Sequence, residues 1–306
     1  MFVRLLGTAA GGGFPQWNCN CCNCRGVRAQ TIQAHARTQS SVALSADGQR
    51  WFLLNASPDL RVQMESFSSL WPPPDTPRGT TVEAVLLTDA DLDHTLGLLL
   101  LREGGDRTIY ATSSVRYALS TGLALDSMLS SYCRVEWREP AAELTPLLCA
   151  DGSSSGLRYA AISLPGKPPR YMRDRVAPQA GDEVGYQFVD DRTGGRLLFL
   201  PGVARLDETI KAYISNCDVL LLDGTFWSEY EMQEMGVGTT VAAQMGHLPV
   251  GGPDGSLQQI AALSVARIIY THINNTNPIL REDSPEHAAV RAAGAEIGWD
   301  GLELTL

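Results

Sequence analysis

A run of acidic residues with the sequence DADLDH occupies positions 89 to 94, directly after the apolar segment Val82–Thr88. That segment has the composition of a buried strand, and residues two apart in an extended chain share a face. We therefore expect Asp89, Asp91 and Asp93 to point together. Three carboxylates in one place repel each other and need a cation to stay ionised at low free-energy cost. The run, which ends in His94, predicts the metal-binding part of an active site.

Two other interpretations of this run lead to different chemistry. Asp93 could be the N-cap of a helix over Thr95–Leu101, with the other acids facing solvent. A calcium-binding EF-hand loop also opens with alternating acids, but its sixth residue is Gly and its twelfth is Glu. Counted from Asp89, those positions hold His94 and Leu100, which excludes an EF-hand.

Four of the seven cysteines lie between positions 19 and 24. The Cys-x-Cys-x-x-Cys spacing lets the thiolates of Cys19, Cys21 and Cys24 converge on one zinc ion, and Cys22 is spare. Zinc also needs a fourth ligand, and a site with four protein ligands would be structural. A disulfide scaffold would spread its cysteines more evenly, so this usage indicates a reducing compartment and a cytoplasmic protein.

Histidines are scarce, with five in the chain. His247 follows a flexible Met-Gly turn, and His272 ends an apolar strand, which are the places where metal ligands usually stand. Both are therefore candidate partners of His94. His287 lies on the expected surface face of a helix, and His35 fits either a structural or a ligand role.

Short apolar segments bounded by turn residues predict the elements that position these side chains. The expected strands are Phe2–Leu6, Ser41–Ser45, Trp51–Asn55, Ala84–Thr88, Thr108–Ala111, Leu157–Leu164, Gly185–Val189, Arg196–Leu200, Val219–Asp223 and Arg267–His272. The expected helices are Thr95–Arg102, Ser114–Ser120, Leu206–Ser215, Gly255–Leu263 and Ser284–Ala293. Strands lead in clusters and helices follow in each half, which predicts an α/β fold of packed sheets with helices outside. We expect residues 1–306 to form a single domain.

Composition narrows the classes of partner. The net charge of −10 repels phosphate backbones and anionic lipid, so nucleic acid and membrane surfaces are not expected partners. No stretch approaches the roughly 20 apolar residues that span a bilayer. The glycine-rich segment 7–13 lets backbone approach a ligand closely, and the long loop 165–182 could act as a lid. Trp227 and Tyr230, if exposed, could pack against a second copy in a homodimer.

Four segments together carry a resemblance to a known family. They read GTAAGGGFPQWNC from position 7, TDADLDH from position 88, MGH from position 245 and THINNTNP from position 271. In this combination they resemble the B proteins of pyrroloquinoline quinone (PQQ) biosynthesis, within the metallo-β-lactamase superfamily. The cysteine triplet resembles the phosphodiesterase branch of that superfamily. The resemblance implies an αββα sandwich of two packed mixed sheets with helices outside.

The sequence departs from the superfamily pattern at several metal ligands. The superfamily motif His-x-His-x-Asp-His reads here Asp-x-Asp-x-Asp-His. A later histidine ligand and a bridging aspartate are expected near Gly166 and Gly202, so two ligands of a dinuclear zinc hydrolase are absent. The histidine that completes the structural zinc in the phosphodiesterase branch is replaced by Asn275. The fourth zinc ligand is therefore Asn275, His272 or water.

The ligand set that remains suits a different metal. Two histidines and a carboxylate with open positions are typical of non-haem iron oxygenases. Asp93, His94, His247 and His272 would supply such a set for iron or another divalent metal. Asp89 and Asp91 would hold these ligands in place or bind a substrate amine.

The resemblance also implies the reaction and the substrate. It implies an iron- and oxygen-dependent hydroxylase whose substrate is a small molecule, the cross-linked Glu–Tyr precursor of PQQ. The tyrosine ring of that precursor would be hydroxylated. Two alternatives stay open: a carrier for PQQ or its precursor, in which the acidic motif is a relic, and a residual metal-dependent hydrolase.

Overall fold

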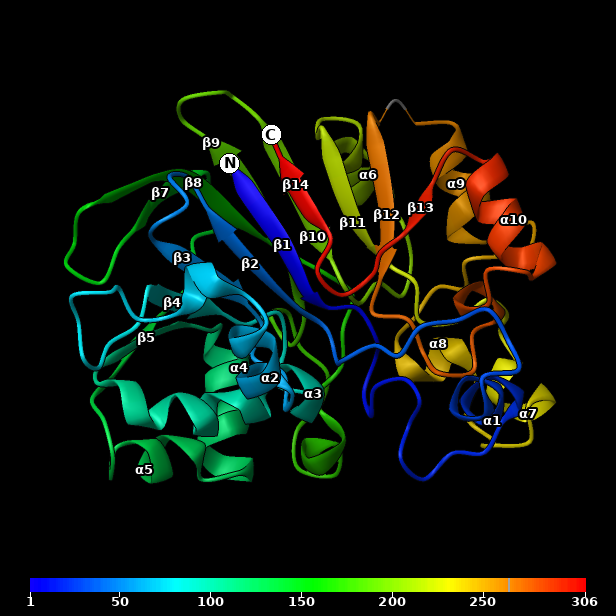
Figure 1. Cartoon of the computed structure of the whole chain (residues 1–306), viewed down its shortest axis with the longest axis horizontal. Coiled ribbons are helices and arrows are strands. Elements are labelled where there is room, and N and C mark those ends of the chain that lie inside the picture. The colour runs from blue at the N-terminus through cyan, green and yellow to red at the C-terminus, as the bar shows by residue number, and fades with distance from the viewer. Residues whose placement is uncertain (264) are drawn as a thin grey trace.

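Two seven-stranded sheets pack face to face, with helices on both outer faces (Figure 1). The computed structural model describes residues 1–263 and 265–306. The expected sandwich of two mixed sheets with outer helices is confirmed.

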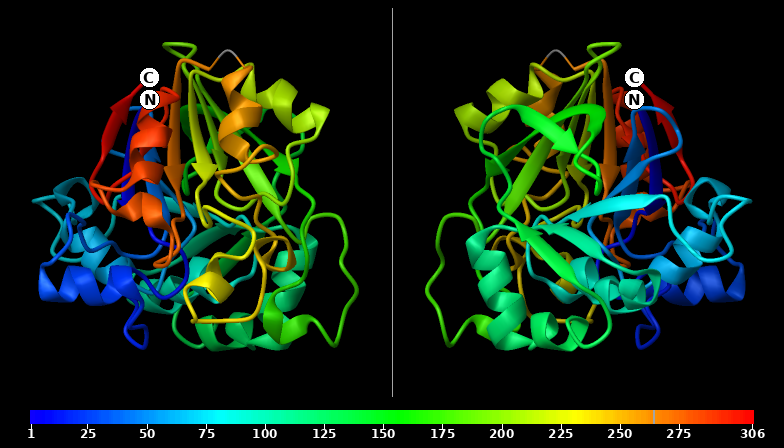
Figure 2. Two further views of the ribbon diagram at one scale, coloured as in Figure 1. Left: turned by 90° about the vertical axis from the view of Figure 1, so that its right-hand side faces the viewer. Right: turned by 90° about the vertical axis from the view of Figure 1, so that its left-hand side faces the viewer.

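The first sheet contains most of the N-terminal half of the chain and closes with the last strand. β1 pairs antiparallel with both β2 and β14, whereas β3 to β6 run parallel to one another. In sheet order its strands are β14 (Glu303–Thr305), β1 (Phe2–Gly7), β2 (Ser41–Ser45), β3 (Trp51–Leu54), β4 (Val82–Leu86), β5 (Arg107–Tyr110) and β6 (Val135–Arg138). The two chain ends lie side by side, where the Met1 ammonium donates to the Leu306 carbonyl at 2.7 Å (Figure 2).

The second sheet changes from antiparallel to parallel at β10. β7 to β10 pair antiparallel, and β10 to β13 pair parallel. In sheet order its strands are β13 (Glu296–Ile297), β12 (Arg267–Thr271), β11 (Val219–Asp223), β10 (Arg196–Leu200), β9 (Val184–Asp190), β8 (Ser154–Ser163) and β7 (Thr145–Leu148). Because neighbouring parallel strands end at the same edge, the loops after β11 and β12 are adjacent.

Apolar side chains form three layers. One fills the space between the two sheets, and the other two lie between each sheet and the helices on its outer face. Phe52 and Phe199 are fully buried between the sheets. Ile210, Ile260 and Val290 bring three helices onto the outer face of the second sheet. The helices are α1 (Cys22–Ala29), α2 (Leu60–Glu65), α3 (Leu92–Thr95), α4 (Ser113–Tyr117), α5 (Leu125–Leu129), α6 (Glu208–Ile214), α7 (Glu231–Glu234), α8 (Ala242–Met245), α9 (Ser256–Ala261) and α10 (Pro285–Ala292), with short helical segments η1 (Ser68–Leu70), η2 (Leu96–Gly104), η3 (Ala118–Gly122), η4 (Arg170–Met172) and η5 (Pro278–Leu280).

Each of the ten expected strands corresponds to a strand of the structure, but four strands were not expected. These are the four edge strands β6, β7, β13 and β14, which carry polar residues and so lack a long apolar run.

Trp227 does not form the expected exposed surface, because its ring packs against the core of the second sheet; Tyr230 is exposed. Within residues 1–263 and 265–306, the helices are all too short or too polar to cross a bilayer.

Candidate metal centre

A cleft opens at the edge of the sandwich where the loops after β4, β11 and β12 meet. It contains all six residues that the sequence placed in an active site, Asp89, Asp91, Asp93, His94, His247 and His272. The glycine-rich loop lines it as well. Gly11 packs so closely on Asp93 that a Cβ at this position would lie 3.3 Å from the carboxylate carbon.

Asp89 orients His94. Its carboxylate Oδ2 lies 2.7 Å from His94 Nδ1 and accepts a hydrogen bond from the Thr88 hydroxyl at 2.6 Å. Thr88 is held in turn by the side chain of Asn55, at 2.9 Å. The Nε2 atom of His94 is buried and has no hydrogen-bond partner within the described part of the chain. A buried imidazole nitrogen left in this state suits a metal ligand.

Asp223, the last residue of β11, orients the other two histidines. Its Oδ2 lies 2.7 Å from His247 Nδ1, and its Oδ1 accepts a hydrogen bond from the Thr225 hydroxyl at 2.6 Å. The Thr225 oxygen lies 2.8 Å from His272 Nδ1. Since the hydroxyl donates to Asp223, it accepts from Nδ1–H of His272. Asp223 therefore fixes the ring of His247 directly and that of His272 through Thr225.

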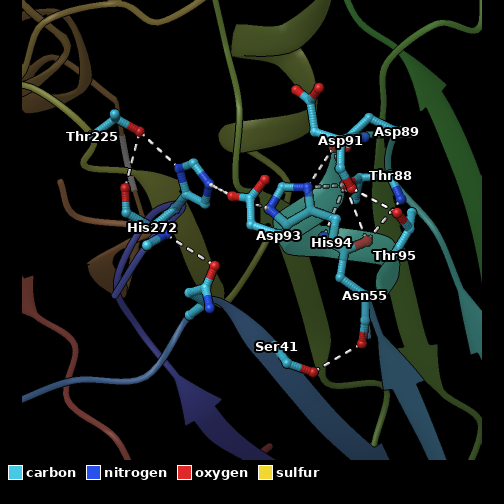
Figure 3. Close-up of polar contacts among 12 residues, drawn as sticks. Ser41, Asn55, Thr88, Asp89, Asp91, Asp93, His94, Thr95, Thr225 and His272 are labelled. Carbon is cyan, nitrogen blue, oxygen red and sulfur yellow. Dashed lines mark hydrogen bonds and ion pairs between the residues drawn. The ribbon is translucent and has the colours of Figure 1, made fainter. Parts of the chain in front are cut away.

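The three imidazoles thus share one arrangement. Each Nδ1 is bound to an orienting group, which leaves Nε2 as the free nitrogen. Asp93 completes the group, with Oδ2 at 3.3 Å from His272 Nε2 and 3.9 Å from His94 Nε2 (Figure 3). His247 stacks on His272 with ring centroids 5.5 Å apart. Histidines that bind metals usually have their second nitrogen tied in this way.

Asp91 differs from its two neighbours in the acidic run. The expectation that Asp89, Asp91 and Asp93 share a face is wrong, because β4 ends at Leu86 and α3 begins at Leu92. In Figure 3 the Asp91 carboxylate points away from His94, whereas Asp93 lies between His94 and His272. The alternative of Asp93 as an N-cap is also wrong, because Asp91 is the N-cap residue of α3.

The cleft holds more negative charge than its imidazoles neutralise. Burial opposes a charge on His94, but Asp89 and Asp93 outweigh it and raise the pKa of His94 to about 10. Burial, together with Asp89 and Asp93, raises the pKa of Asp91 to about 7. A cation in the cleft would replace protons in balancing these carboxylates.

Glu183, just before β9, is a further carboxylate of the cleft. It stands against Gly166 and Gly202, and a side chain at either glycine would collide with it. Burial raises the pKa of Glu183 to about 8, and the charge of Asp89 adds to this shift. Glu183 thus fills the space beside the two positions at which the superfamily pattern would place ligands.

The three predicted zinc-binding cysteines form a second group of potential ligands. The sulfur atoms of Cys19, Cys21 and Cys24 all lie within 4.8 Å of one another. Asn275 covers them, with its side-chain Nδ2 at 3.1 Å from Cys19 Sγ and 3.3 Å from Cys24 Sγ. Burial raises the pKa of the Cys21 thiol to about 12, so three thiolates need a cation here. His272 lies in the cleft with Asp93 and His94, so of the two residues expected as a fourth zinc ligand, Asn275 is the one beside the sulfurs.

The cysteine group is fastened to the loop that follows His272. Asn23, which is fully buried in α1, donates through Nδ2 to the carbonyls of Asn275, Thr276 and Asn277 at 3.0 to 3.1 Å. The loop between β12 and η5 is therefore bound to α1 at several points. A metal ion at the cysteines would stabilise this connection and, through it, the position of His272.

Replacing Cys24 by Ser is expected to remove zinc from the protein and to lower the melting temperature by roughly 5 °C or more, because zinc binding contributes directly to folding. Zinc content and thermal unfolding measure the two effects. Cys22→Ser is the matched control, since Cys22 lies outside the sulfur triangle. Equal zinc content in the two variants would contradict the assignment.

Comparisons with known proteins show the family of this chain. A family model described as the β-lactamase superfamily domain matches residues 50–273. Coenzyme PQQ synthesis protein B of Pseudomonas putida is 44% identical over 307 residues, and that of Methylococcus capsulatus is 45% identical over 313 residues; both alignments cover 100% of each chain. The chain belongs to the coenzyme PQQ synthesis protein B family.

A solved structure of a family member extends the comparison. Zn²⁺-bound PqqB from Methylobacterium extorquens is 40% identical, with a TM-score of 0.91 and coverage of 100% of both chains. The expected family and fold are both confirmed.

Sequence reasoning missed three polar residues of this centre. Asp223 was expected only as a strand end, although an acid directly after a buried apolar strand is the same signal that identified Asp89. Thr225 and Glu183 carried no signal of their own, because their roles depend on contacts with distant segments.

The two remaining histidines, His35 and His287, lie outside the cleft in a separate surface groove. His287 Nδ1 is 2.9 Å from the Ile279 carbonyl oxygen.

Proposed function

We propose that this protein acts in PQQ biosynthesis as an iron- and oxygen-dependent hydroxylase of the tyrosine ring in the cross-linked Glu–Tyr precursor. The observation that carries the proposal is a set of three imidazoles, each tied at Nδ1, of which His94 and His272 face the carboxylate of Asp93 and His247 stacks on His272. The family's role in coenzyme PQQ synthesis supplies the substrate class.

The donor set fits one divalent metal ion. Asp93, His94 and His272 offer ligand atoms within 4.8 Å of one another, and His247 adjoins them. The orphaned Nε2 of His94 accounts for one of these ligands. Nitrogen and carboxylate donors with open positions suit iron, which when bound supplies one-electron chemistry with dioxygen.

The second metal proposed for this chain is structural zinc. Cys19, Cys21 and Cys24 would hold it, with the side chain of Asn275 in the fourth position. The terminal torsion of Asn275 exchanges its amide nitrogen and oxygen, so the group that now contacts the sulfurs can present Oδ1 to the ion. This site has no open position and takes no part in the reaction.

The chain's own residues prepare the reaction in the cleft. Asp89 and Asp223 hold the imidazole rings in one tautomer, so that proton positions are fixed before substrate binds. In the overall reaction, one oxygen atom of dioxygen enters a ring C–H bond to give C–O–H, and the other leaves as water. Two electrons and two protons are required, and an external two-electron reductant of the ascorbate class supplies the electrons.

The experiment is anaerobic reconstitution with ferrous iron, followed by oxygen, ascorbate and the cross-linked diamino acid. The expected result is a product that carries one added oxygen atom, with label from ¹⁸O₂. A reaction without oxygen, or an unchanged substrate, would reject the hydroxylase. Tight binding of PQQ that is insensitive to His94→Ala would instead support the carrier function, and oxygen-independent cleavage of a phosphoester would support the hydrolase.

A further inference from the structure

Two cations and one anion stand unpaired at the mouth of the cleft. Lys167 and Arg173 line it from the loop that precedes β9, and Asp91 lines it from the acidic run. Within the described residues, none of the three takes part in an ion pair within 4 Å. The cleft residues His94 and His247, by contrast, each pair with an aspartate. Charges that share a cleft without pairing are available for a ligand.

The loop that carries the two cations is held in place across the cleft. Lys167 Nζ donates to the Gln244 carbonyl at 2.6 Å, and the Tyr171 hydroxyl donates to the Ala90 carbonyl at 2.8 Å. The first contact joins the loop to the end of α8, next to His247, and the second joins it to the acidic run. Lys167 therefore has a fixed position relative to the metal ligands, and the loop that carries Arg173 is anchored to the acidic run.

The charges around these cations constrain the ligand. Asp89, Asp93 and Glu183 line the deeper part of the cleft and would repel a phosphate or another compact polyanion. Burial lowers the pKa of Lys167 to about 8, and the positive charge of Arg173 contributes, so a single carboxylate bound beside both would relieve this repulsion. The unpaired carboxylate of Asp91 is available to a positive group on the same molecule.

We propose that Lys167, Arg173 and Asp91 form the recognition site for the α-amino-acid end of the substrate, the cations binding its carboxylate and Asp91 its ammonium group. This inference rests on the proposed function, which names the ring that is hydroxylated. What it adds is the set of residues that bind the charged end of the same substrate. The aromatic ring then extends from this site toward Asp93 and His94. A ligand without the carboxylate loses only its contact with the two cations. A ligand without the ammonium group loses only its contact with Asp91.

Binding of three catechols to the metal-loaded protein under anaerobic conditions tests the site. 3,4-Dihydroxyphenylalanine carries both groups, dopamine lacks the carboxylate, and 3,4-dihydroxyphenylpropionate lacks the amine. Lys167→Met and Arg173→Met should each weaken binding of the two carboxylates about tenfold and leave dopamine unchanged. Asp91→Asn should weaken the two amines about tenfold and leave the propionate unchanged.

Arg175→Met is the matched control, because Arg175 is an exposed arginine of the same loop outside the cleft lining. It should change none of the three dissociation constants. Equal losses for all three catechols in the Lys167 and Arg173 variants, or no loss at all, would overturn the inference. Because binding is measured without turnover, a selective pattern in a protein that hydroxylates nothing would reject the proposed function and retain this site.

Discussion

Asp93→Ala is expected to lower the rate of oxygen-dependent hydroxylation by at least about 1,000-fold, the largest effect of any single change proposed for this chain. The carboxylate lies between His272 and His94, and among the described residues it is the one acid group within 4 Å of the Nε2 atoms of both rings. Its loss would remove the one anionic ligand and leave two buried imidazoles facing each other. Single-turnover formation of hydroxylated product measures the effect.

Asp174→Ala is the control for this change, because Asp174 is an exposed carboxylate of the neighbouring loop outside the cleft lining. It should retain the wild-type rate. Hydroxylation by the Asp93 variant at a rate within tenfold of the wild type would show that Asp93 does not hold the metal.

Asp223→Ala is expected to weaken binding of the cleft metal by about 10- to 100-fold, the usual effect of removing a group that orients a ligand. The carboxylate is fully buried, fixes His247 directly and reaches His272 through the Thr225 hydroxyl. Without it both rings are free to turn, so the ligand atoms lose their preorganised positions. Equilibrium titration of metal-free protein with ferrous iron under anaerobic conditions measures the affinity.

A buried carboxylate far from the cleft separates this effect from a general loss of stability. Asp190 ends β9 and pairs with the Met1 ammonium, so Asp190→Asn should lower stability and leave the iron affinity unchanged. Thr225→Val should reproduce part of the loss, and Thr225→Ser, which keeps the hydroxyl, should restore it. An iron affinity in Asp223→Ala equal to that of the wild type would contradict the orienting role.

The sequence predicted the location of the centre because its signals are local. An acidic run after an apolar strand, a cysteine triplet with zinc spacing and two histidines at strand or turn ends are all visible within a few residues. The expected strands Ser41–Ser45, Arg196–Leu200 and Val219–Asp223 match the structure residue for residue, since their apolar runs are continuous.

The division of labour among the acids could not be predicted from the sequence. Alternation along an extended chain suggested equal roles for Asp89, Asp91 and Asp93, but the strand ends at Leu86 and the three carboxylates diverge. Asp89 turns back to His94, Asp93 reaches across to His272, and Asp91 points away from His94. These directions depend on the turn between β4 and α3 and on its packing against Asn55.

Roles that depend on contacts across the fold were also hidden. Asp223 and His247 are 24 residues apart in sequence, and Thr225 and His272 are 47 apart. Only the parallel pairing of β11 with β12 brings the ends of these strands together. In the sequence, Gly166 and Gly202 occupy positions where the superfamily pattern has metal ligands. In the structure, the side chain of Glu183 occupies the space beside both glycines.

The metal content of protein purified without added metal, compared between the wild type and Asp93→Ala, tests whether Asp93 holds a metal in the cleft. This assignment predicts two metals per wild-type chain, zinc at the cysteines and a redox-active metal in the cleft. In the Asp93 variant it predicts that zinc is retained and the second metal is lost. Zinc alone in the wild type, or an unchanged second metal in the variant, would contradict it.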